Sequence, residues 1–578
     1  MDLRFYDLPP EILIDIASLY LDFIDIYSLQ RTCRTVLRVI QSSLQLRYKL
    51  ELQIAGMLDN PLCEQPTSTR LDMLRARERA WAFFEYPFLS TPQLPRRPSG
   101  LYDVTPSVCL LGKADDDSTT RSIQAVRLPH QANIIKKWDI IHFDAEIIDF
   151  GTSIEENDLI ASVCLTPIRD FPNMSRLCII LRRYSTQALY DGIASPIILL
   201  SEEPVNRRHP IVRIEIFGAN LAVIVMFMDV MSDALMYVFN WRTGSRTEKL
   251  DPIPVTYPRL VFLREDILLN PQLAPDSLNI YHIPSSSSER VHLVQRLKFP
   301  QFNPGFGISV IACRGDPSPT TNGLFPQNTP HHGPYTNNPE EAVIVFTLTV
   351  TGRDDDSDDD DDADEDDDDG DDDNEDDDDE DNQRASYFVM VVHRKSLLNL
   401  LPAHFDTTSP SRAVPWESWG PPITRWHGVH RHSISFVTIS AGQRLVEFRS
   451  SRGGREDECN DDIHILDFNP CHVRLAQAHG DAQSKKAMTT VIGGGSPPRS
   501  TTHPLSGSST EKNPAATSDT TSYLGNVRRE NPENVYPRGK VFVNDVVSRL
   551  PYVRCTSTER WAAYDPMLID EERLIGTR

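Results

Sequence analysis

The spacing of hydrophobic residues changes at Pro87, and this change constrains the fold more than any other feature of the sequence. Up to that residue, apolar side chains recur every three or four positions, which is the repeat of an α-helix. Beyond it, short apolar runs are separated by Pro, Gly, Asn and Asp. No long amphipathic helix interrupts these runs to serve as a crossover between parallel strands. The pattern therefore favours antiparallel sheet, in a sandwich, a barrel or a propeller.

Two helices are expected within the first 45 residues. The first begins near Leu8, with Pro and Glu in its first turn. Its apolar face contains Ile12, Leu13, Ile16 and Leu19. The second has Asp25 as its expected N-cap. Its apolar face contains Ile26, Leu29, Cys33, Val36 and Ile40.

Residues 44–54 fit two different structures. Alternate residues from Leu44 to Ile54 are apolar, as in a strand, but the residues from Leu46 to Met57 also fit a helix that ends near Gly56. Periodicity alone does not separate the two. A further helix is expected at about 68–86, and Pro87 stops it. Its apolar face contains Leu71, Leu74, Trp81 and Phe84.

Eleven short runs with β character follow Pro87. They are Leu159–Leu165, Leu177–Leu181, Val212–Phe217, Leu221–Met228, Met236–Trp241, Leu278–Ile283, Ala342–Leu348, Tyr387–Val392, Ile434–Ile439, Leu445–Phe448 and Ile463–Phe468. This region is far longer than a sandwich of about 100 residues. At about 40–50 residues per blade it could hold six to eight propeller blades. The three runs between 212 and 241 resemble one blade, although no repeated blade signature is present.

The negative charge of the chain is concentrated in one insertion. The formal net charge is −25, and 24 of the 28 residues from Asp354 to Asp381 are acidic. Without them, 59 acidic residues balance 58 basic ones, so a basic surface for nucleic acid is excluded as the main feature. The run separates two strands that could otherwise form a hairpin, at a small entropic cost. It is expected to be a solvated loop, with attraction of a basic partner as the alternative.

Other sequence features bear on the compartment. The longest apolar run, Leu221–Met228, is much shorter than the roughly 18 residues of a membrane-spanning helix. The N-terminus lacks a basic segment and a cleavage site. The nine cysteines are scattered and include no CxxC pair. We therefore expect reduced thiols in the cytoplasm or the nucleus, and no zinc framework.

The N-terminal segment resembles the F-box. It contains Leu8-Pro9-Pro10-Glu11-Ile12-Leu13, followed by Leu29-Gln-Arg-Thr-Cys33-Arg34 at the expected distance. The family often has Trp two or three residues after Cys-Arg, where this chain has Val36 and Leu37. Later segments are similar to a large basidiomycete fungal group of F-box proteins with a C-terminal β-rich domain. They are Pro415–Pro421, Thr424–Trp426, Gly442–Arg444, Ser548–Tyr552 and Ile569–Glu571.

This resemblance implies a non-catalytic receptor subunit of an SCF-type cullin-RING ubiquitin ligase. The F-box would dock on the Skp adaptor and through it on a cullin, and the β region would select an unknown protein substrate. Carried over residue by residue, the adaptor contacts are Leu8, Pro9, Ile12, Leu13, Ile16, Leu29 and Cys33. Three alternatives remain: an F-box protein that acts without a cullin, an enzyme built on a propeller, and helices that merely cap the β region.

No motif for a catalytic, cofactor or metal site is recognisable. The chain lacks GxxxxGK[ST], HExxH and GxSxG, and the histidines at 427, 430 and 432 have no cysteine set nearby. Partners other than proteins, such as nucleic acid or a membrane, are not expected. A cluster of three tryptophans either packs between β units, which we favour, or lines a substrate surface. Its members are Trp416, Trp419 and Trp426.

The sequence thus predicts an α+β multidomain protein. A three-helix F-box module at 1–45 is followed by linking helices at 46–87 and a Pro-rich linker at 88–105. A large all-β, propeller-like domain then occupies 106–578. It contains two disordered insertions, one acidic at 351–385 and one rich in Ser, Thr, Gly and Pro at 484–522.

Overall fold

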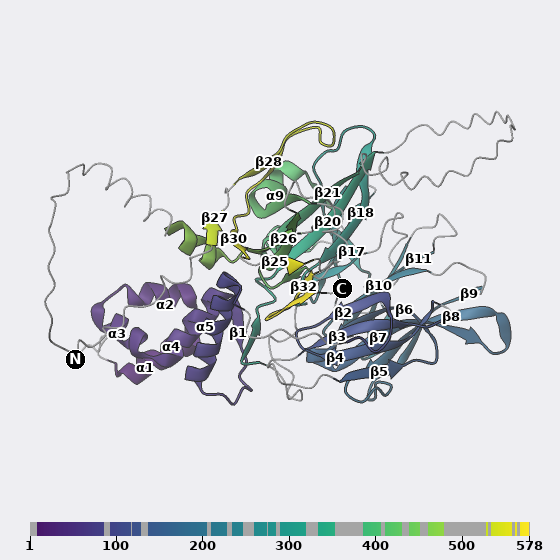
Figure 1. Cartoon of the computed structure of the whole chain (residues 1–578), viewed down its shortest axis with the longest axis horizontal. Coiled ribbons are helices and arrows are strands. Elements are labelled where there is room, and N and C mark those ends of the chain that lie inside the picture. The colour runs from purple at the N-terminus through teal and green to yellow at the C-terminus, as the bar shows by residue number, and fades with distance from the viewer. Residues whose placement is uncertain are drawn as a thin grey trace.

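A computed structural model describes residues 8–576 with several gaps. The gaps are 86–92, 117, 129–136, 205–209, 228–233, 247–258, 274–275, 285–288, 319–332, 353–384, 406–410, 430–438, 451–459, 479–526, 530–532, 558–560 and 563–566. A helical module lies to one side of a large group of β-sheets (Figure 1). None of the helices in the described residues has the length and apolar character that a membrane crossing requires.

The helical module consists of α1 (Pro10–Tyr20), α2 (Phe23–Gln30), α3 (Arg34–Ser42), α4 (Leu44–Ala55) and α5 (Thr67–Phe83). Residues 1–45 contain the three predicted helices, α1 to α3, and α4 begins at Leu44. Residues 44–55 are helical, which decides between the two alternatives for that segment. Ser43 caps α4 by accepting a hydrogen bond from the Leu46 amide, and Gly56 ends it in the left-handed conformation with φ of 69°.

The predicted second helix is divided in two. The Thr32 hydroxyl donates a hydrogen bond to the Leu29 carbonyl, and the backbone of Cys33 is extended with φ of −156°. A side-chain hydroxyl that bonds the preceding turn competes with the helical ladder, so α2 ends and α3 restarts after Cys33. The predicted cap is also corrected, because Asp22 accepts the hydrogen bond from the Asp25 amide at 2.8 Å.

Six antiparallel sheets follow one another in chain order within the described residues. The first sheet contains β2 (Pro98–Val104), β3 (Val108–Ala114), β4 (Thr120–Arg127) and β5 (Trp138–His142). The second contains β6 (Glu146–Ser153), β7 (Leu159–Ile168), β8 (Phe171–Arg183) and β9 (Ile197–Pro204). The third contains β10 (Ile211–Phe217), β11 (Asn220–Met226), β12 (Leu235–Asn240) and β13 (Ser245–Arg246).

Of the next three sheets, the fourth and the sixth carry additional strands, whereas the fifth has four. The fourth sheet contains β14 (Val261–Arg264), β15 (Ile267–Leu273), β16 (Asp276–His282), β17 (His292–Lys298) and β22 (Arg412–Val414), and β22 pairs with β17 in parallel. The fifth contains β18 (Phe306–Arg314), β20 (Val343–Gly352), β21 (Ala385–His393) and β23 (Thr424–Val429). The sixth contains β24 (Ser440–Ala441), β25 (Arg444–Ser450), β26 (Asn460–Asp467), β27 (Val527–Arg529), β30 (Val553–Thr556) and β31 (Trp561–Ala562).

Smaller elements connect these sheets. They are α6 (Ile154–Asn157), α8 (Arg394–Leu398) and α9 (Trp416–Ile423), and the antiparallel pairs β1 (Met57–Asp59) with β19 (Tyr335–Asn337), β28 (Asn534–Tyr536) with β29 (Val546–Ser548), and β32 (Met567–Ile569) with β33 (Leu574–Gly576).

The apolar cores between successive sheets indicate that the sheets form a ring. Each of five cores joins one sheet to the next, through pairs such as Ile123 and Phe150, Ile179 and Val223, Ile224 and Leu268, Ile280 and Phe346, and Val345 and Ile465. The hairpin β32–β33 completes the circle. It contacts β24 and β25 on one side, and its Leu568 and Ile575 pack on the first sheet on the other. The predicted propeller-like domain is thus confirmed.

Most of the predicted strands coincide with strands of the ring. The three runs between 212 and 241 form the first three strands of the third sheet, and Ala342–Leu348 pairs with Tyr387–Val392 as the expected hairpin. The run Ile434–Ile439, apart from Ile439, and the insertion at 484–522 lie outside the described residues, as do residues 353–384 of the acidic insertion. The predicted bounds of that insertion, 351–385, are corrected, because residues 351–352 belong to β20 and residue 385 to β21. A second boundary is corrected: residues 98–104, assigned to the linker, form β2. Proline is tolerated as the first residue of a strand, so Pro98 did not mark a linker.

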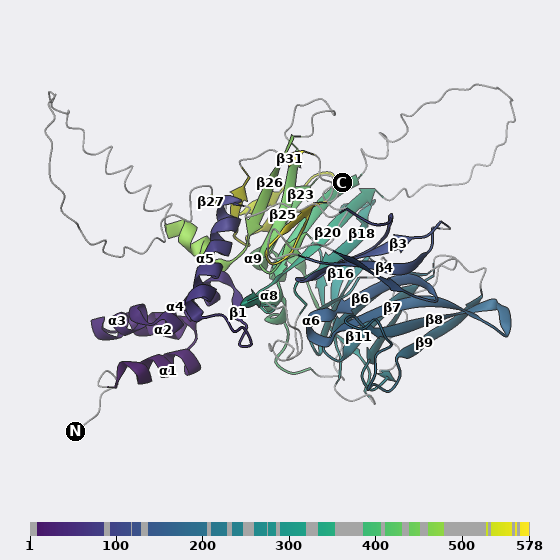
Figure 2. The ribbon, with the colours of Figure 1, turned by 60° about the horizontal axis from the view of Figure 1, so that its bottom comes forward.

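The helical module is joined to the ring by a short sheet and by side-chain contacts. Strand β1 pairs with β19, and the Asn469 amide donates to the Ile54 carbonyl at 2.8 Å. Helix α5 runs back along the sixth sheet (Figure 2), where its Trp81 and Phe84 enter the core shared by the fifth and sixth sheets. The module is therefore part of the same packed body as the ring.

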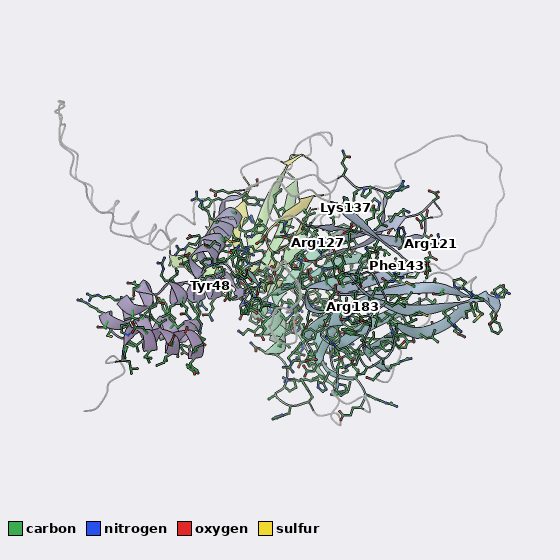
Figure 3. The ribbon with its side chains drawn as sticks, turned by 90° about the horizontal axis from the view of Figure 1, so that it is seen from below. Tyr48, Arg121, Arg127, Lys137, Phe143 and Arg183 are labelled. Carbon is green, nitrogen blue, oxygen red and sulfur yellow. The ribbon has the colours of Figure 1, made fainter. Side chains whose placement is uncertain are left out.

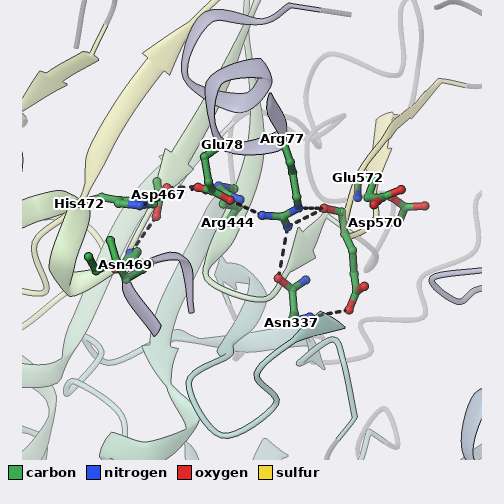
Figure 4. A network of polar contacts seen from close by, with 11 residues as sticks. Arg77, Glu78, Asn337, Arg444, Asp467, Asn469, His472, Asp570 and Glu572 are labelled. Atoms are coloured by element: carbon green, nitrogen blue, oxygen red, sulfur yellow. Dashed lines mark hydrogen bonds and ion pairs between the residues drawn. The ribbon is translucent and has the colours of Figure 1, made fainter. Parts of the chain in front are cut away.

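A buried polar network reinforces this junction (Figure 4). Arg444 of β25 forms ion pairs with Glu78 of α5 at 2.5 Å and with Asp467 at 3.2 Å. Asp467 also accepts a hydrogen bond from His472 at 2.9 Å. Next to Glu78, the Arg77 guanidinium donates to the backbone carbonyl of Glu571 at 2.6 Å. The network thus links α5 to the sixth sheet and to the C-terminal hairpin.

The ion pairs of this network determine which of its buried side chains are charged. Burial alone would raise the pKa values of Glu78 and Asp467, but Arg444 lowers both below their usual range. Burial would lower the pKa of His472, whereas Asp467 raises it above its ordinary value. The two carboxylates therefore add stability above about pH 4 and lose it as the pH falls through their lowered pKa values. The His472 contribution is complete below about pH 6.5 and is lost as the pH rises through its raised pKa.

We predict that Glu78→Ala destabilises the protein by about 3 kcal/mol, because it leaves the buried Arg444 and Arg77 without one carboxylate partner. Thermal denaturation measures the change. The matched control is Glu51→Ala, which removes a more exposed ion pair with Arg75 and should cost less than about 1 kcal/mol. Equal melting temperatures for the two variants would contradict a structural role for the network.

We also predict that the acidic insertion can be deleted without loss of the fold. Strands β20 and β21 pair continuously from Val343 with His393 to Thr351 with Ala385, so their ends already lie side by side. Replacing residues 354–381 by a short Gly/Asn turn should keep the melting temperature within a few degrees. Circular dichroism on both proteins tests this, and a large drop in melting temperature would make the run an integral part of the structure.

Candidate functional site

The four N-terminal helices form a small core of their own. Ala17, Ile26, Val36, Ile40 and Leu46 are buried together, one or two from each helix. The Lys49 ammonium adds a polar tie, because it donates to the backbone carbonyls of Ser18 at 2.7 Å and Leu21 at 2.6 Å. These carbonyls end α1 and have no partner within the helix, and a cation there also complements the helix dipole. The exposed face of these helices is therefore held in a fixed shape.

This face carries a concentration of exposed apolar side chains. Six of the fifteen large hydrophobic residues that are exposed in the described part of the chain lie within residues 12–44. They are Ile12, Leu19, Tyr20, Ile24, Tyr27 and Leu44, with exposed fractions of 45%, 71%, 78%, 69%, 48% and 38%. Clustered apolar surface of this kind marks a site where another protein binds. We call these six residues the apolar surface of the helical module.

The spacing along α1 explains how one helix supplies both the core and this surface. Leu13 and Ala17 are four positions apart and point into the protein, with 4% and 1% of their area exposed. Ile12 and Leu19 are seven positions apart, so they share the opposite side, with the partly buried Ile16 between them. Helix α2 extends the surface at its start, where Phe23 stacks on Tyr27 with ring centroids 6.1 Å apart.

The seven predicted adaptor contacts divide into three groups. Pro9, Ile12 and Cys33 are exposed, and Leu8, Ile16 and Leu29 are partly buried. Leu13 is buried by the protein's own side chains. The contacts themselves remain predictions. Sequence reasoning did not single out Tyr20, Ile24 and Tyr27. The signal that could have found them is their position. Tyr20 lies eight residues after Ile12 on the same helix, and Ile24 and Tyr27 lie two and five residues after the N-cap Asp22.

The junction holds the apolar surface at a fixed position relative to the ring. Tyr48 lies where the outer helices meet the ring (Figure 3), and its hydroxyl donates to Asp59 of β1 at 2.7 Å. Leu71 and Leu74 of α5 pack against α4 and against Tyr335 of β19. All four residues of the predicted face of α5 are buried, as expected. A partner bound to the helices would therefore stand in a defined orientation to anything bound to the ring.

The predicted tryptophan cluster lies in the core. Trp416, Trp419 and Trp426 are 4%, 0% and 0% exposed, between the fourth and fifth sheets. Their rings meet edge to face, and the Trp419 indole donates to the Lys298 carbonyl at 2.9 Å. Burial of this extent fits the packing interpretation and leaves no indole face for a substrate. Of the three clustered histidines, His427 is buried, and the others lie outside the described residues.

Metal ligands are not grouped in the described residues. No set of three or more His, Cys, Asp or Glu side chains there has the geometry to hold a metal ion. The eight described cysteines are all free, and burial raises the pKa of the Cys109, Cys164 and Cys555 thiols to about 12. Buried thiols with raised pKa values are poor nucleophiles.

Solved structures resemble the chain only distantly. The WD40 domain of SCAP from fission yeast is 8% identical, with 65% of this chain and 71% of that chain covered and a TM-score of 0.30. The complex of KlAtg21 with the coiled-coil of AgAtg16 is 11% identical, with 62% of this chain and 73% of that chain covered and a TM-score of 0.27. The GH43_1 enzyme from Xanthomonas citri is 8% identical, with 43% of this chain and 80% of that chain covered and a TM-score of 0.21. Similarity at this level identifies neither a fold nor a function.

Curated protein sequences give no match to the chain. The family model for F-box-like domains, in contrast, matches residues 5–53. The matched segment contains α1, α2, α3 and most of α4, together with all six residues of the apolar surface. The helical part of this protein that carries the apolar surface is therefore an F-box-like domain.

Proposed function

We propose that this protein is the substrate-receptor subunit of an SCF-type ubiquitin ligase. The F-box-like domain docks on a Skp-type adaptor, as F-box domains generally do, and the ring holds a protein substrate. One observation carries the proposal: the apolar surface lies on the F-box-like domain itself, and that domain is fixed to the ring by β1, α5 and the network around Arg444.

This role is non-catalytic, because transfer of ubiquitin belongs to the other subunits of such a ligase. The ring supports the receptor role through its loops, which project from a packed frame where recognition residues usually lie. The free cysteines support a reducing compartment, the cytoplasm or the nucleus. An F-box protein that acts without a cullin shares all these features. Affinity purification of the full chain separates the two, since only the ligase subunit brings a cullin with the adaptor.

We predict that Leu8→Ala with Pro9→Ala removes adaptor binding. The residues lie at the start of α1 beside Ile12, and buried apolar anchors of an interface cost about 2 kcal/mol or more each when truncated. Co-purification with the adaptor measures the loss, and an unchanged melting temperature shows that the ring remains folded. The control is Leu62→Ala, a 52% exposed apolar residue outside the F-box-like domain, which should keep full binding. Adaptor recovery at wild-type level by the double variant would contradict the docking site.

We further predict that substrate choice follows the ring. Residues 1–53 are replaced by the F-box domain of an unrelated protein, with Tyr48 and Leu52 restored because both pack at the junction. The chimaera keeps Ile54 and β1, so the contacts with Asn469 and β19 are preserved. It should ubiquitinate the same proteins as the wild-type chain, as detected by mass spectrometry of ubiquitin remnants. If the targets follow the donor domain instead, the ring is only a scaffold.

A further inference from the structure

The ring encloses a cavity of about 500 Å³, a volume typical of ligand sites. Its wall is built from the first strand of each successive sheet and from the C-terminal hairpin, for example Asp149 of β6, Glu215 of β10 and Ile569 of β32. Leu58 of β1 also lines it, so the cavity borders the junction with the F-box-like domain. The site thus depends on every part of the ring.

The lining is strongly acidic. Nine carboxylate side chains and three guanidinium groups line the cavity. Two of the arginines are already paired: Arg314 binds Asp103 at 2.7 Å and Asp316 at 2.5 Å, and Arg213 lies 3.4 Å from Asp149. The cavity therefore favours entry of a positively charged group.

Glu215 is the carboxylate left over from this pairing. It lies in the middle of β10, opposite Ala222 of β11, and its carboxylate has no hydrogen bond or ion pair with any described residue. Burial raises its pKa to about 8, and the neighbouring Asp103, Asp316 and Asp149 add to this increase, although Arg314 opposes it. Glu215 is partly buried, and a partly desolvated acid without a partner costs folding free energy, which a bound cation would recover.

Arg259 is a second ionic group in the wall without a bonded partner. It precedes β14, and its carbonyl accepts a hydrogen bond from the Asn270 amide at 2.7 Å, but its guanidinium has no hydrogen bond or ion pair with any described residue. Burial and the nearby Arg213 lower its pKa to about 10. A guanidinium in this position calls for a hydrogen-bond acceptor from the ligand. A free amine would satisfy Glu215 alone, whereas a peptide brings backbone carbonyl oxygens as well.

We propose that this cavity binds a lysine or arginine side chain of the protein substrate, with its cation paired to Glu215 and a neighbouring carbonyl oxygen accepting from Arg259. The proposal rests on the receptor function, since it names the substrate feature that the ring reads. The shared chemistry is a primary ammonium or guanidinium cation, which could also come from a free amine. The experiment separates these two sources.

The test uses the full-length chain and fluorescein-labelled degenerate nine-residue peptide pools with one fixed central residue: lysine, arginine, glutamine or norleucine. Fluorescence anisotropy should give at least about tenfold tighter binding of the lysine and arginine pools, since one charge pair of about 1.4 kcal/mol corresponds to that factor. Glu215→Gln, which keeps the size of the side chain, should remove the preference. The control Glu265→Gln changes an exposed glutamate on the β14–β15 turn and should retain it.

The pH dependence provides a second readout that needs no variant. Below about pH 8 the bound cation must displace a proton from Glu215, so the affinity for the lysine pool should rise by about tenfold per pH unit between pH 6.5 and 8 and then level off. In Glu215→Gln the profile should be flat. Asp103, Asp149, Asp316 and Arg314 lie near Glu215 in both proteins, so their presence is common to the two profiles.

Equal binding of the lysine and norleucine pools would overturn the proposal, and so would a lysine preference that survives in Glu215→Gln. Competition by n-butylamine at the same concentration as the peptide would also overturn it, because that result would assign the cavity to small amines. Adaptor co-purification from the same preparations keeps the two proposals apart. Loss of the adaptor with an intact lysine preference overturns the receptor function alone. Retention of the adaptor without a lysine preference overturns the cavity site alone.

Discussion

Closure of the ring by the hairpin β32–β33 is the constraint on which the remaining structure depends. A circle of sheets leaves apolar surface open at its first and last members unless another segment covers both. Here Leu568 and Ile575 pack on the first sheet, and β32 contacts the sixth. The carbonyl of Glu571 in the same hairpin accepts a hydrogen bond from Arg77 of α5. The hairpin residues from Ile569 to Glu572 also line the cavity. One short segment thus sets the ring, the junction and the cavity together.

The junction gives the two functions of the molecule a fixed geometry. An isolated F-box-like domain on a flexible linker would let a bound substrate sample many positions relative to the adaptor. In this chain the link consists of a strand pair, a long helix buried at Trp81 and Phe84, and ion pairs around Arg444. A substrate bound in the central cavity, as we propose, would therefore be presented at a distance and angle that the fold determines.

Local patterns predicted much of this architecture, and long-range pairing accounts for what they missed. Short apolar runs bounded by Pro, Gly, Asn and Asp located the strands, because the side chains of these runs are buried in the cores between the sheets. The helical face from Leu71 to Phe84 was recognisable because its residues are buried as well. The break at Thr32 depends on one hydroxyl contact, which periodicity cannot register. Glu215 looks like any outward-facing strand residue until the ring places it in the cavity, opposite residues more than 100 positions away.

Closure by the last strands also fixes an order of events during synthesis. Val104, Cys109 and Val126 of the first sheet leave the ribosome roughly 440 residues before Leu568 and Ile575, which cover them. At about 5–20 residues per second, this interval lasts on the order of 20–90 s. For that time the first sheet presents an uncovered apolar surface on the nascent chain. It is the surface that a ribosome-associated chaperone would have to shield until translation of the hairpin is complete.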